Sequence, residues 1–541
     1  MPQYRNPVIP GFHPDPSICW ADGFFYLVTS SFEYFPGIPI FRSVDLVHWT
    51  QIGHVLDRPS QLHLEHAPDS GGIFAPTIRH HAGRFYVTGT NVSDRGHFIV
   101  STDDPSGAWS DPIWVDQNGI DPSLSFIDGR VLFQSNVEPA PGGAHELVPD
   151  FTRGIQQSEI DLATGEILFG PEFIWSGSGG RFPEGPHLYR RGDWYYLVAA
   201  EGGTEWGHIA TVARARSPWG PFESSPHGPI LDHRSVVSPF QAVGHADLIE
   251  LADGSWWAVC LGIRPEGGWP HHLLGRETLL APVSWTDDGW PVIGAGGVVP
   301  ETHDVPFPHL EQQQPTESGG ASFPSGGDLD PAWVTVRTPL DDAAWTARPE
   351  HLVLRPRGAE LSGARPCFLG RRQEHKSFRA RTRVRIDTPD ASLRAGLVVR
   401  MNSEHFIALA ASRGAHGELR LELEQRIGAL RVVTPLGAVR GDVVDLEVAA
   451  TPGEYRFSAT GQHGAELHAP PVAARLISTE MASGFTGAFV GMFADGDRSD
   501  QGAADFDLFD YERGAATVPR DSETAEPTSV ERAVLPQPAR V

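Results

Sequence analysis

The chain has 541 residues, too many for one compact core, so at least two domains are expected. Its 42 Lys and Arg against 68 Asp and Glu leave a formal charge of −26. This charge argues against nucleic acid and anionic membranes as partners, because both require clustered positive charge. No apolar run approaches the roughly 18 residues of a membrane span, and no leader pattern is present, so we expect a cytoplasmic protein.

Gly (59) and Pro (47) are abundant, and aromatic residues make up 10% of the chain. Many short strands joined by turns produce such a composition, so the predicted fold class is all-β. The three cysteines, Cys19, Cys260 and Cys367, lie far apart in the sequence. They indicate neither a disulfide framework nor a zinc site.

Five stretches repeat one plan: a small or polar residue, an apolar one, a Gly-containing turn and an aromatic-rich strand. They read DPSICWADGFFYLVTS, APTIRHHAGRFYVTGT, DPSLSFIDGRVLFQSN, GPHLYRRGDWYYLVAA and HADLIELADGSWWAVC, and begin at Asp15, Ala75, Asp121, Gly185 and His245. Each stretch predicts a hairpin, and the spacing is close to that of four-stranded propeller blades. Segments between the copies, such as IPIFRSVDLVHWTQIG, would supply outer strands. The sequence therefore predicts a five-bladed β-propeller over residues 1–303.

The openings of the repeats carry charged groups. Asp15 and Asp121 open two copies, Glu184 immediately precedes a third, and His245 opens the fifth. A single acid at the start of a strand is most often a turn former. The first strand of each propeller blade lines the central channel, however, so acids at this shared position should converge on one site.

Prolines surround these acids. Asp15 lies between two prolines, Asp121 precedes one and Glu184 follows one. Since a residue before proline is biased toward extended backbone, we expect Asp15 and Asp121 to be extended and rigidly held.

Two carboxyl groups facing each other across a pocket can hydrolyse a glycosidic bond. One protonates the leaving oxygen, and the other activates water or attacks the sugar. A third, ionised acid would raise the pKa of the proton donor by like-charge repulsion. Asp15, Asp121 and Glu184 fit this scheme. Two alternatives stay open: a non-catalytic carbohydrate-binding propeller with a lectin-like sandwich, and a retaining propeller glycosidase with a nucleophile in place of the base.

Further pocket candidates are an arginine and two aromatic residues. Arg276 in HHLLGRETLLAPVSW could bind sugar hydroxyls or a carboxylate, with a surface position as the alternative. Phe32 in SSFEYFPG and Phe74 in GGIFAPT could form the wall of a sugar site, with core packing as the alternative.

A series of motifs in this order resembles the β-xylosidases of glycoside hydrolase family 43, over residues 6 to about 512. The motifs are NPVIPGFHPDPSI, SSFEYFPGIPIFRSVDLVHW, SGGIFAPT, GIDPSLSF, RFPEGPHLY, GHADLIE and LGRETLLAPVSW. The resemblance implies a five-bladed propeller and an inverting mechanism. It makes Asp15 the general base, Glu184 the general acid, and Asp121 the residue that modulates the pKa of the acid and orients it.

The same resemblance implies that Arg276 and His245 contact substrate or the acids and that Phe32 shapes the sugar pocket. Phe74 stands where relatives usually carry Trp. No cofactor is expected to be required; some members bind Ca²⁺ near the histidine equivalent to His245, so Ca²⁺ is left open. The expected activity is release of xylose from the non-reducing ends of xylooligosaccharides, with α-L-arabinofuranosidase activity as a second specificity. The family often assembles into dimers or tetramers, so a homo-oligomer is expected.

Beyond the propeller, residues 304–326 are rich in Pro, Gly, Gln and Ser and read as a linker. Residues 327–513 alternate apolar and polar side chains at period two, as in FRARTRVRIDT and VVDLEVAA, which predicts a β-sandwich. The resemblance makes this a concanavalin-like domain whose loop closes the pocket with an aromatic residue, Phe485, with Phe489 as the alternative. Residues 514–541 are small, polar and Pro-interrupted and predict a disordered tail.

Overall fold

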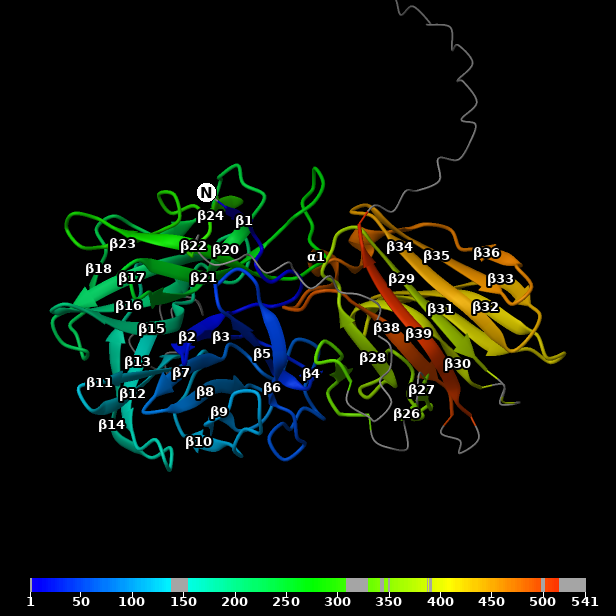
Figure 1. The fold of residues 1–541 in the computed structure, drawn as a ribbon, viewed down its shortest axis with the longest axis horizontal. Helices are drawn as coiled ribbons and strands as arrows, with labels where there is room; N and C mark the ends of the chain where they lie inside the picture. The colour runs from blue at the N-terminus through cyan, green and yellow to red at the C-terminus, as the bar shows by residue number, and fades with distance from the viewer. Residues whose placement is uncertain are drawn as a thin grey trace, which may run out of the picture.

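The computed structural model describes residues 2–137, 154–307, 329–340, 345–348, 351–386, 388, 392–497 and 502–514. These residues form two all-β domains that lie side by side, an N-terminal propeller and a C-terminal sandwich (Figure 1). In the described residues, helix is limited to η1 (Ala474–Ile477) and α1 (Thr479–Ala482). No helix in these ranges is long and apolar enough to cross a membrane.

Five antiparallel sheets form the blades, each beginning with one sequence repeat. Blade 1 contains β2 (Ser17–Ala21), β3 (Phe24–Val28), β5 (Gly37–Ser43) and β6 (Thr50–Leu56), and blade 2 contains β7 (Thr77–His81), β8 (Arg84–Asn91), β9 (Gly96–Thr102) and β10 (Ile113–Val115). Blade 3 contains β11 (Ser123–Ile127), β12 (Arg130–Val137), β13 (Gly154–Ile160) and β14 (Ile167–Trp175). Blade 4 contains β15 (Glu184–Arg191), β16 (Trp194–Glu201), β17 (Ile209–Ala215), β18 (Glu223–Ser224) and β19 (Leu231–Asp232). Blade 5 contains β20 (Gln241–Glu250), β21 (Trp256–Ile263), β22 (Glu277–Trp285) and β23 (Pro291–Ile293).

The first strand of each blade is the innermost. Strands β2, β7, β11, β15 and β20 contact one another in turn, and β2 also contacts β20, which closes the ring. The N-terminal strand β1 (Gln3–Arg5) pairs with β24 (Thr302–Asp304) beside blade 5. The prediction of five blades built on five hairpins is therefore confirmed.

Tight turns at the tips of the hairpins explain the Gly in each repeat. In the first repeat, Asp22 and Gly23 form a two-residue turn with φ of 50° and 86°. Two residues of positive φ give the type I′ turn, whose twist matches that of the flanking strands. The same pattern recurs at Asp128 and Gly129, with φ of 51° and 77°.

The backbone at the repeat openings differs from the prediction. Asp15 and Asp121 are not extended but left-handed, with φ of 56° and 55°, and Gly185 and His245 share this conformation. The bias of a residue before proline toward extended backbone is local, and Asp tolerates positive φ better than most residues. Here the sharp entry into the inner strand overrides the bias, so the carboxyl groups are carried by strained backbone.

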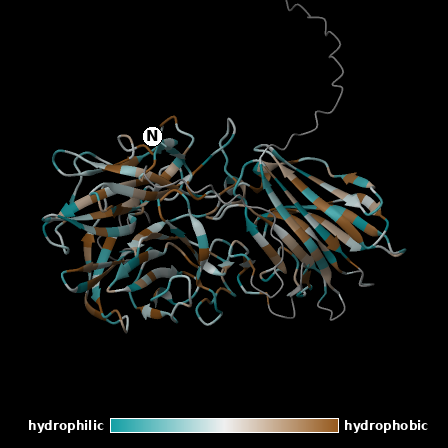
Figure 2. Ribbon diagram, in the orientation of Figure 1, coloured by the Kyte–Doolittle hydropathy of each residue, from teal (hydrophilic) through white to brown (hydrophobic). Residues whose placement is uncertain are grey.

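Two sheets form the sandwich. One contains β26 (Trp345–Arg348), β27 (His351–Leu354), β39 (Ala504–Arg513), β29 (Phe378–Arg385), β34 (Val443–Ala450), β35 (Glu454–Gly461), β36 (Glu466–His468) and β37 (Val472–Ala473). The other contains β28 (Phe368–Arg372), β38 (Phe489–Asp495), β30 (Arg394–Asn402), β31 (His405–Arg413), β32 (Leu419–Ile427) and β33 (Leu430–Val439). Buried residues alternate along β34 and β35, as the period-two pattern predicts, and Figure 2 shows hydrophobic and hydrophilic residues interspersed along the sandwich strands.

The two domains share an apolar interface. Strands β30 and β38 are buried on both faces, because one face packs in the sandwich core and the other packs on the propeller. The ring of Phe489 stacks on Tyr34 of the propeller at 3.9 Å between centroids. Tyr34 itself belongs to β4 (Tyr34–Phe35), which pairs with β25 (Thr335–Val336) of the C-terminal part. The sandwich thus packs on the propeller at Tyr34, two residues after Phe32 in the chain.

The domain boundaries stay predictions. Most of the predicted linker lies outside the described residues, as does the predicted tail after Gly514. Packing of the propeller extends to Phe307, whose ring lies 5.8 Å from that of Phe25.

Candidate active site

A pocket of about 870 Å³ lies where the five inner strands begin. Its lining includes the opening residue of every repeat or its immediate neighbour, since Asp15, Ala75, Asp121, Glu184 and His245 all face it. All eight residues singled out from the sequence line this pocket: Asp15, Phe32, Phe74, Asp121, Glu184, His245, Arg276 and Phe485. The repeats therefore converge on one site.

Asp15 is buried and strongly held. Its Oδ2 accepts a hydrogen bond of 2.6 Å from the Ser30 hydroxyl, and its Oδ1 accepts one of 3.0 Å from Arg276 Nη1. His245 Nδ1 lies 3.7 Å from the same Oδ1. Burial by itself would raise the pKa of Asp15, but Arg276, His245 and the Ser30 hydrogen bond outweigh it and lower that pKa. Asp15 is therefore a carboxylate at neutral pH.

Asp121 lies at the end of a turn that Asn136 fixes. The Ile120 N–H donates to Asn136 Oδ1 at 2.7 Å, and the Asn136 N–H donates back to the Ile120 carbonyl at 3.1 Å. At Gly119, with φ of 101°, a Cβ atom would come within 1.8 Å of the Asn136 carbonyl, so only glycine fits. This turn presents the Asp121 carboxyl to the pocket from blade 3.

Glu184 begins β15 in blade 4 and is half-buried in the pocket lining. A break in the register between Glu184 and His187 separates it from the regular ladder with β16. Such a bulge re-aims a side chain at the end of a strand. Glu184 is thus the most exposed of the three acids, whereas Asp15 and Asp121 are buried.

His245 is buried in the pocket lining, beside Asp15. Its ring packs on Gly185, where a Cβ atom would lie 2.8 Å from His245 Cε1. Burial and then the Arg276 charge lower the pKa of His245, against the opposing effect of Asp15. The imidazole is therefore neutral at pH 7, and the guanidinium of Arg276 is the cation that balances Asp15.

Below the pocket, a charged network ties the blades together. Asp247 on β20 is fully buried and accepts hydrogen bonds of 2.8 and 3.2 Å from Arg79 on β7. It also accepts bonds of 2.6 Å from the hydroxyls of Tyr189 on β15 and Ser17 on β2. The network thus spans four blades. Sequence reasoning missed it, although Asp247 and Arg79 were visible as charges on inner strands.

Three phenylalanines form the apolar wall of the pocket. The rings of Phe32, Phe74 and Phe485 lie 5.1, 5.9 and 6.0 Å apart pairwise. The Arg276 guanidinium lies 5.5 Å from the Phe32 centroid and 5.8 Å from that of Phe485. Phe485 belongs to the sandwich, so both domains build the wall. Phe489, the alternative, is instead fully buried against Tyr34 in the domain interface.

Several lining residues were not predicted, because they lie outside the repeats, on loops or, for Glu480, in helix α1. Thr204 accepts a 2.9 Å hydrogen bond from Arg276 Nη1, and Trp206 on the same loop is 44% exposed. His272 and Glu480 meet across the domain boundary at 2.7 Å at another part of the rim. In the sequence, these residues appear only as isolated aromatic or polar residues, and no repeated pattern marks them as part of the site.

Among the described residues, no group of three or more His, Cys, Asp or Glu side chains could hold a metal ion. The prediction that no cofactor is required, with Ca²⁺ left open near His245, is not tested by this and stays a prediction.

Three carboxyl groups, a buried arginine and an aromatic wall at the axis of a propeller define a glycoside hydrolase. The comparisons with known proteins agree. Residues 4–291 match the family model described as glycosyl hydrolases family 43, and residues 322–512 match the beta xylosidase C-terminal concanavalin A-like domain. The chain belongs to glycosyl hydrolases family 43.

Named relatives cover nearly the whole chain. A non-reducing end alpha-L-arabinofuranosidase of Bacteroides ovatus is 40% identical over 94% of both chains. A xylosidase/arabinosidase of Humicola insolens is 34% identical over 94% of this chain and 98% of its own. Among solved structures, a xylan beta-1,4-xylosidase of Bacillus halodurans is 31% identical, with a TM-score of 0.87 over 94% of this chain and 100% of its own.

Proposed function

We propose that this chain is an exo-acting, inverting β-D-xylosidase that releases xylose from the non-reducing ends of xylooligosaccharides. The observation that carries the proposal is the single pocket lined by Asp15, Asp121 and Glu184. Relatives that cover nearly the whole chain are named beta-xylosidase or xylosidase/arabinosidase, which supports the substrate class.

In this proposal Asp15 is the general base. Its lowered pKa keeps it ionised, so it can take a proton from a water molecule that attacks the anomeric carbon. Glu184 is the general acid and gives its proton to the glycosidic oxygen as the bond to the anomeric carbon breaks. Attack and departure on opposite faces of the ring convert a β-xyloside into α-xylose. The negative charge of Asp121 favours the protonated form of Glu184 and orients it.

Arg276 has two tasks in the same scheme. One nitrogen holds Asp15 at 3.0 Å, and another donates to the Phe485 carbonyl at 3.3 Å. The guanidinium therefore couples the base to the loop of the sandwich that closes the pocket. A pocket closed on this side admits the end of a chain, which supports exo action.

A second specificity, for α-L-arabinofuranosides, is favoured by two observations. The Bacteroides ovatus relative at 40% identity carries that activity in its name. Phe74 also stands in the wall where the resemblance expects Trp, so the wall lacks an indole N–H and its sugar preference can differ from that of the Trp-containing xylosidases.

The test is hydrolysis of xylobiose by the wild type, Asp15→Ala and Glu184→Ala, with product anomers followed by NMR at early times. We expect α-xylose first and a large loss of rate in both variants. Asp128→Asn is the matched control, because Asp128 is an exposed acid in a hairpin turn, paired with Arg190. Initial β-xylose would indicate a retaining enzyme, and binding without turnover would indicate a carbohydrate-binding protein.

Assembly, cofactor and location form the remaining part of the proposal: a cytoplasmic homo-oligomer, dimer or tetramer, that requires no cofactor. Leu430 and Val432 are 69% and 53% exposed on β33, an edge strand of the sandwich, which supports assembly through this domain. Light scattering after size exclusion measures the assembly, and activity after dialysis against EDTA tests the cofactor.

A further inference from the structure

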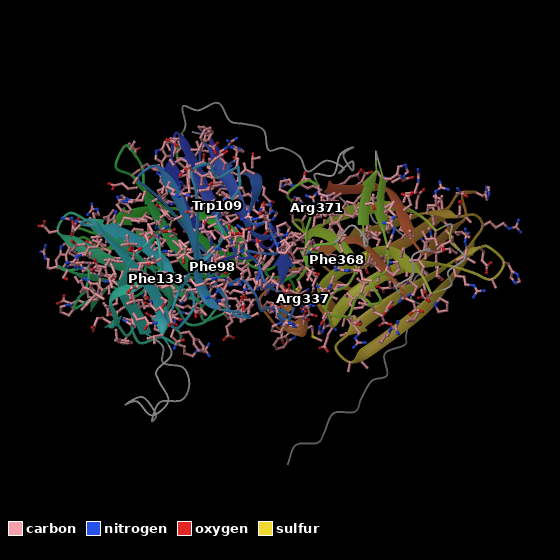
Figure 3. The ribbon with its side chains drawn as sticks, turned by 90° about the horizontal axis from the view of Figure 1, so that it is seen from below. Phe98, Trp109, Phe133, Arg337, Phe368 and Arg371 are labelled. Atoms are coloured by element: carbon pink, nitrogen blue, oxygen red, sulfur yellow. The ribbon has the colours of Figure 1, made fainter. Side chains whose placement is uncertain are left out.

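A polar cluster joins the two domains behind the aromatic wall. We name it the interdomain cluster; its members are Glu33, Asp69, Ser70, Arg337, Arg400 and Ser403. Asp69 lies between blades 1 and 2, and both of its oxygens bind the C-terminal domain. Oδ1 accepts a 2.7 Å bond from Arg337 Nη2, and Oδ2 accepts the Ser403 N–H at 3.0 Å and the Ser403 hydroxyl. Figure 3 shows Arg337 at the junction of the domains.

Ser70 connects this cluster to the pocket wall. Its N–H donates to Glu33 Oε2 at 3.0 Å, and its hydroxyl oxygen accepts the Phe485 N–H at 2.9 Å. At Gly484, with φ of 90°, a Cβ atom would lie 2.3 Å from Ser70 Oγ. The loop can therefore settle on Ser70 only because residue 484 has no side chain.

Glu33, which accepts the Ser70 N–H, is itself held in the domain interface. Glu33 is fully buried, and its carbonyl accepts the Arg337 N–H at 2.7 Å. Arg400, also fully buried, donates to the Tyr34 hydroxyl at 3.3 Å. Asp69 and Arg337 form the ion pair of the cluster at 2.7 Å, and removing either partner would leave an uncompensated buried charge. Ser70 is therefore attached to this interface through its bond to Glu33 and through its neighbour Asp69.

Phe32 and Glu33 are adjacent in the chain, and one lines the pocket while the other belongs to the cluster. On the pocket side, Phe485 packs 5.9 Å from Phe32, and its carbonyl accepts a bond from Arg276. We propose that Ser70, held by the interdomain cluster, is a positioning residue that keeps Phe485 over the sugar site. This proposal deepens the proposed function and rests on it for its kinetic readout.

The expected signature is a KM effect. Ser70 is not among the residues that line the pocket; it reaches the pocket wall through the backbone N–H of Phe485. Loss of its hydroxyl should loosen the wall that binds ground state and transition state alike, which raises KM with little change in kcat. A purely structural role would instead reduce the amount of active enzyme and lower the apparent kcat.

The test compares full-length wild type, Ser70→Ala and Asp69→Asn on xylobiose. We expect KM to rise about five- to tenfold in Ser70→Ala, which loses one hydrogen bond to the loop. KM should also rise in Asp69→Asn, which loses the charge that pairs with Arg337 beside Ser70. In a Phe485→Ala background, Ser70→Ala should change KM by less than about twofold, because the group it positions is gone. An unchanged KM in the single variants, or full additivity with Phe485→Ala, overturns the proposal.

Gln51→Ala is the matched control. Gln51 Nε2 donates to the Pro331 carbonyl at 2.9 Å, an interdomain bond remote from Phe485, so KM should stay unchanged. An equal rise in this control would indicate general loosening of the interface and would count against Ser70.

Hydrogen exchange separates this proposal from the proposed function. The amide of Phe485 should exchange faster in Ser70→Ala than in the wild type, since its acceptor is lost. If the wild type hydrolyses no pentoside, the proposed function fails, and the exchange rate still decides the role of Ser70. Equal exchange in both proteins overturns the positioning role whatever the activity.

Discussion

Arg276 Nη1 lies 3.0 Å from Asp15 Oδ1, and both side chains are buried in the pocket. The two residues are 261 positions apart, on opposite sides of the seam where blade 5 meets blade 1. Closure of the propeller therefore creates the ion pair that keeps Asp15 ionised in a buried site.

The first prediction concerns the acid limb of the pH–rate profile. Burial raises the pKa of Asp15, and Arg276, His245 and Ser30 lower it by more than burial raises it. Arg276→Met removes the largest lowering contribution, so the pKa of Asp15 rises and the acid limb of kcat/KM moves to higher pH. Ser30→Ala should move it in the same direction by less. A limb that stays in place in both variants would exclude Asp15 as the base.

Leaving-group dependence should distinguish the two catalytic carboxyl groups. Glu184→Gln should lose about 10²- to 10⁴-fold in kcat/KM on xylobiose, whose leaving group needs a proton. On a dinitrophenyl xyloside the loss should nearly vanish, because that leaving group departs unprotonated. Asp15→Asn should be impaired on both substrates, since water must be activated in either case. If Glu184→Gln were equally impaired on both substrates, the acid would have to be another residue.

Glu33 should make the stability of the protein depend on pH. Burial and then Asp69 raise its pKa from 4.5 to about 7, against Arg400 and Arg337. Between about pH 4.5 and pH 7, the folded state holds a proton on Glu33 that the unfolded state has lost. The free energy of unfolding therefore falls as the pH rises through this range. Glu33→Gln should remove that dependence and stabilise the protein at pH 8 by up to about 3 kcal/mol.

Urea unfolding at pH 5 and pH 8 measures this effect. Exposed Glu223, in the two-residue strand β18, provides the control variant Glu223→Gln, which should leave the pH dependence as in the wild type. A Glu33→Gln variant that loses stability with pH as the wild type does would place the proton elsewhere.

The propeller and its acids could be predicted because their signals are local and repeated. Each blade begins with a hairpin whose turn needs positive φ, so Asp22–Gly23 and its counterparts mark the repeats in the sequence. Aligning the repeats then places Asp15, Asp121 and Glu184 at equivalent ends of inner strands. Knowledge of the three-dimensional contacts was not needed for that step.

Contacts between distant segments could not be predicted in this way. The pairing of β4 with β25 joins residues 300 positions apart, and no pattern in either segment indicates its partner. Asp69 and Ser70 lie in a loop outside the repeats, so their role in seating Phe485 appears only once both domains are in place. The left-handed backbone of Asp15 likewise depends on tertiary contacts that override the preference of the following proline.

Substitutions at Gly185 and Gly192 separate two effects: the close contact of residue 185 with the His245 ring, and the backbone strain of a side chain at positive φ. Both glycines lie on the hairpin of blade 4 with φ near 60°, but a Cβ atom would strike the His245 ring at Gly185 and meet nothing within 4 Å at Gly192. Gly192→Ala should therefore cost about 1 to 2 kcal/mol from the left-handed conformation alone, with kcat unchanged. Gly185→Ala should cost more and also lower kcat, because the displaced imidazole disturbs Asp15. Thermal unfolding and xylobiose kinetics measure the two effects, and equal behaviour of both variants would show that His245 needs no such close support.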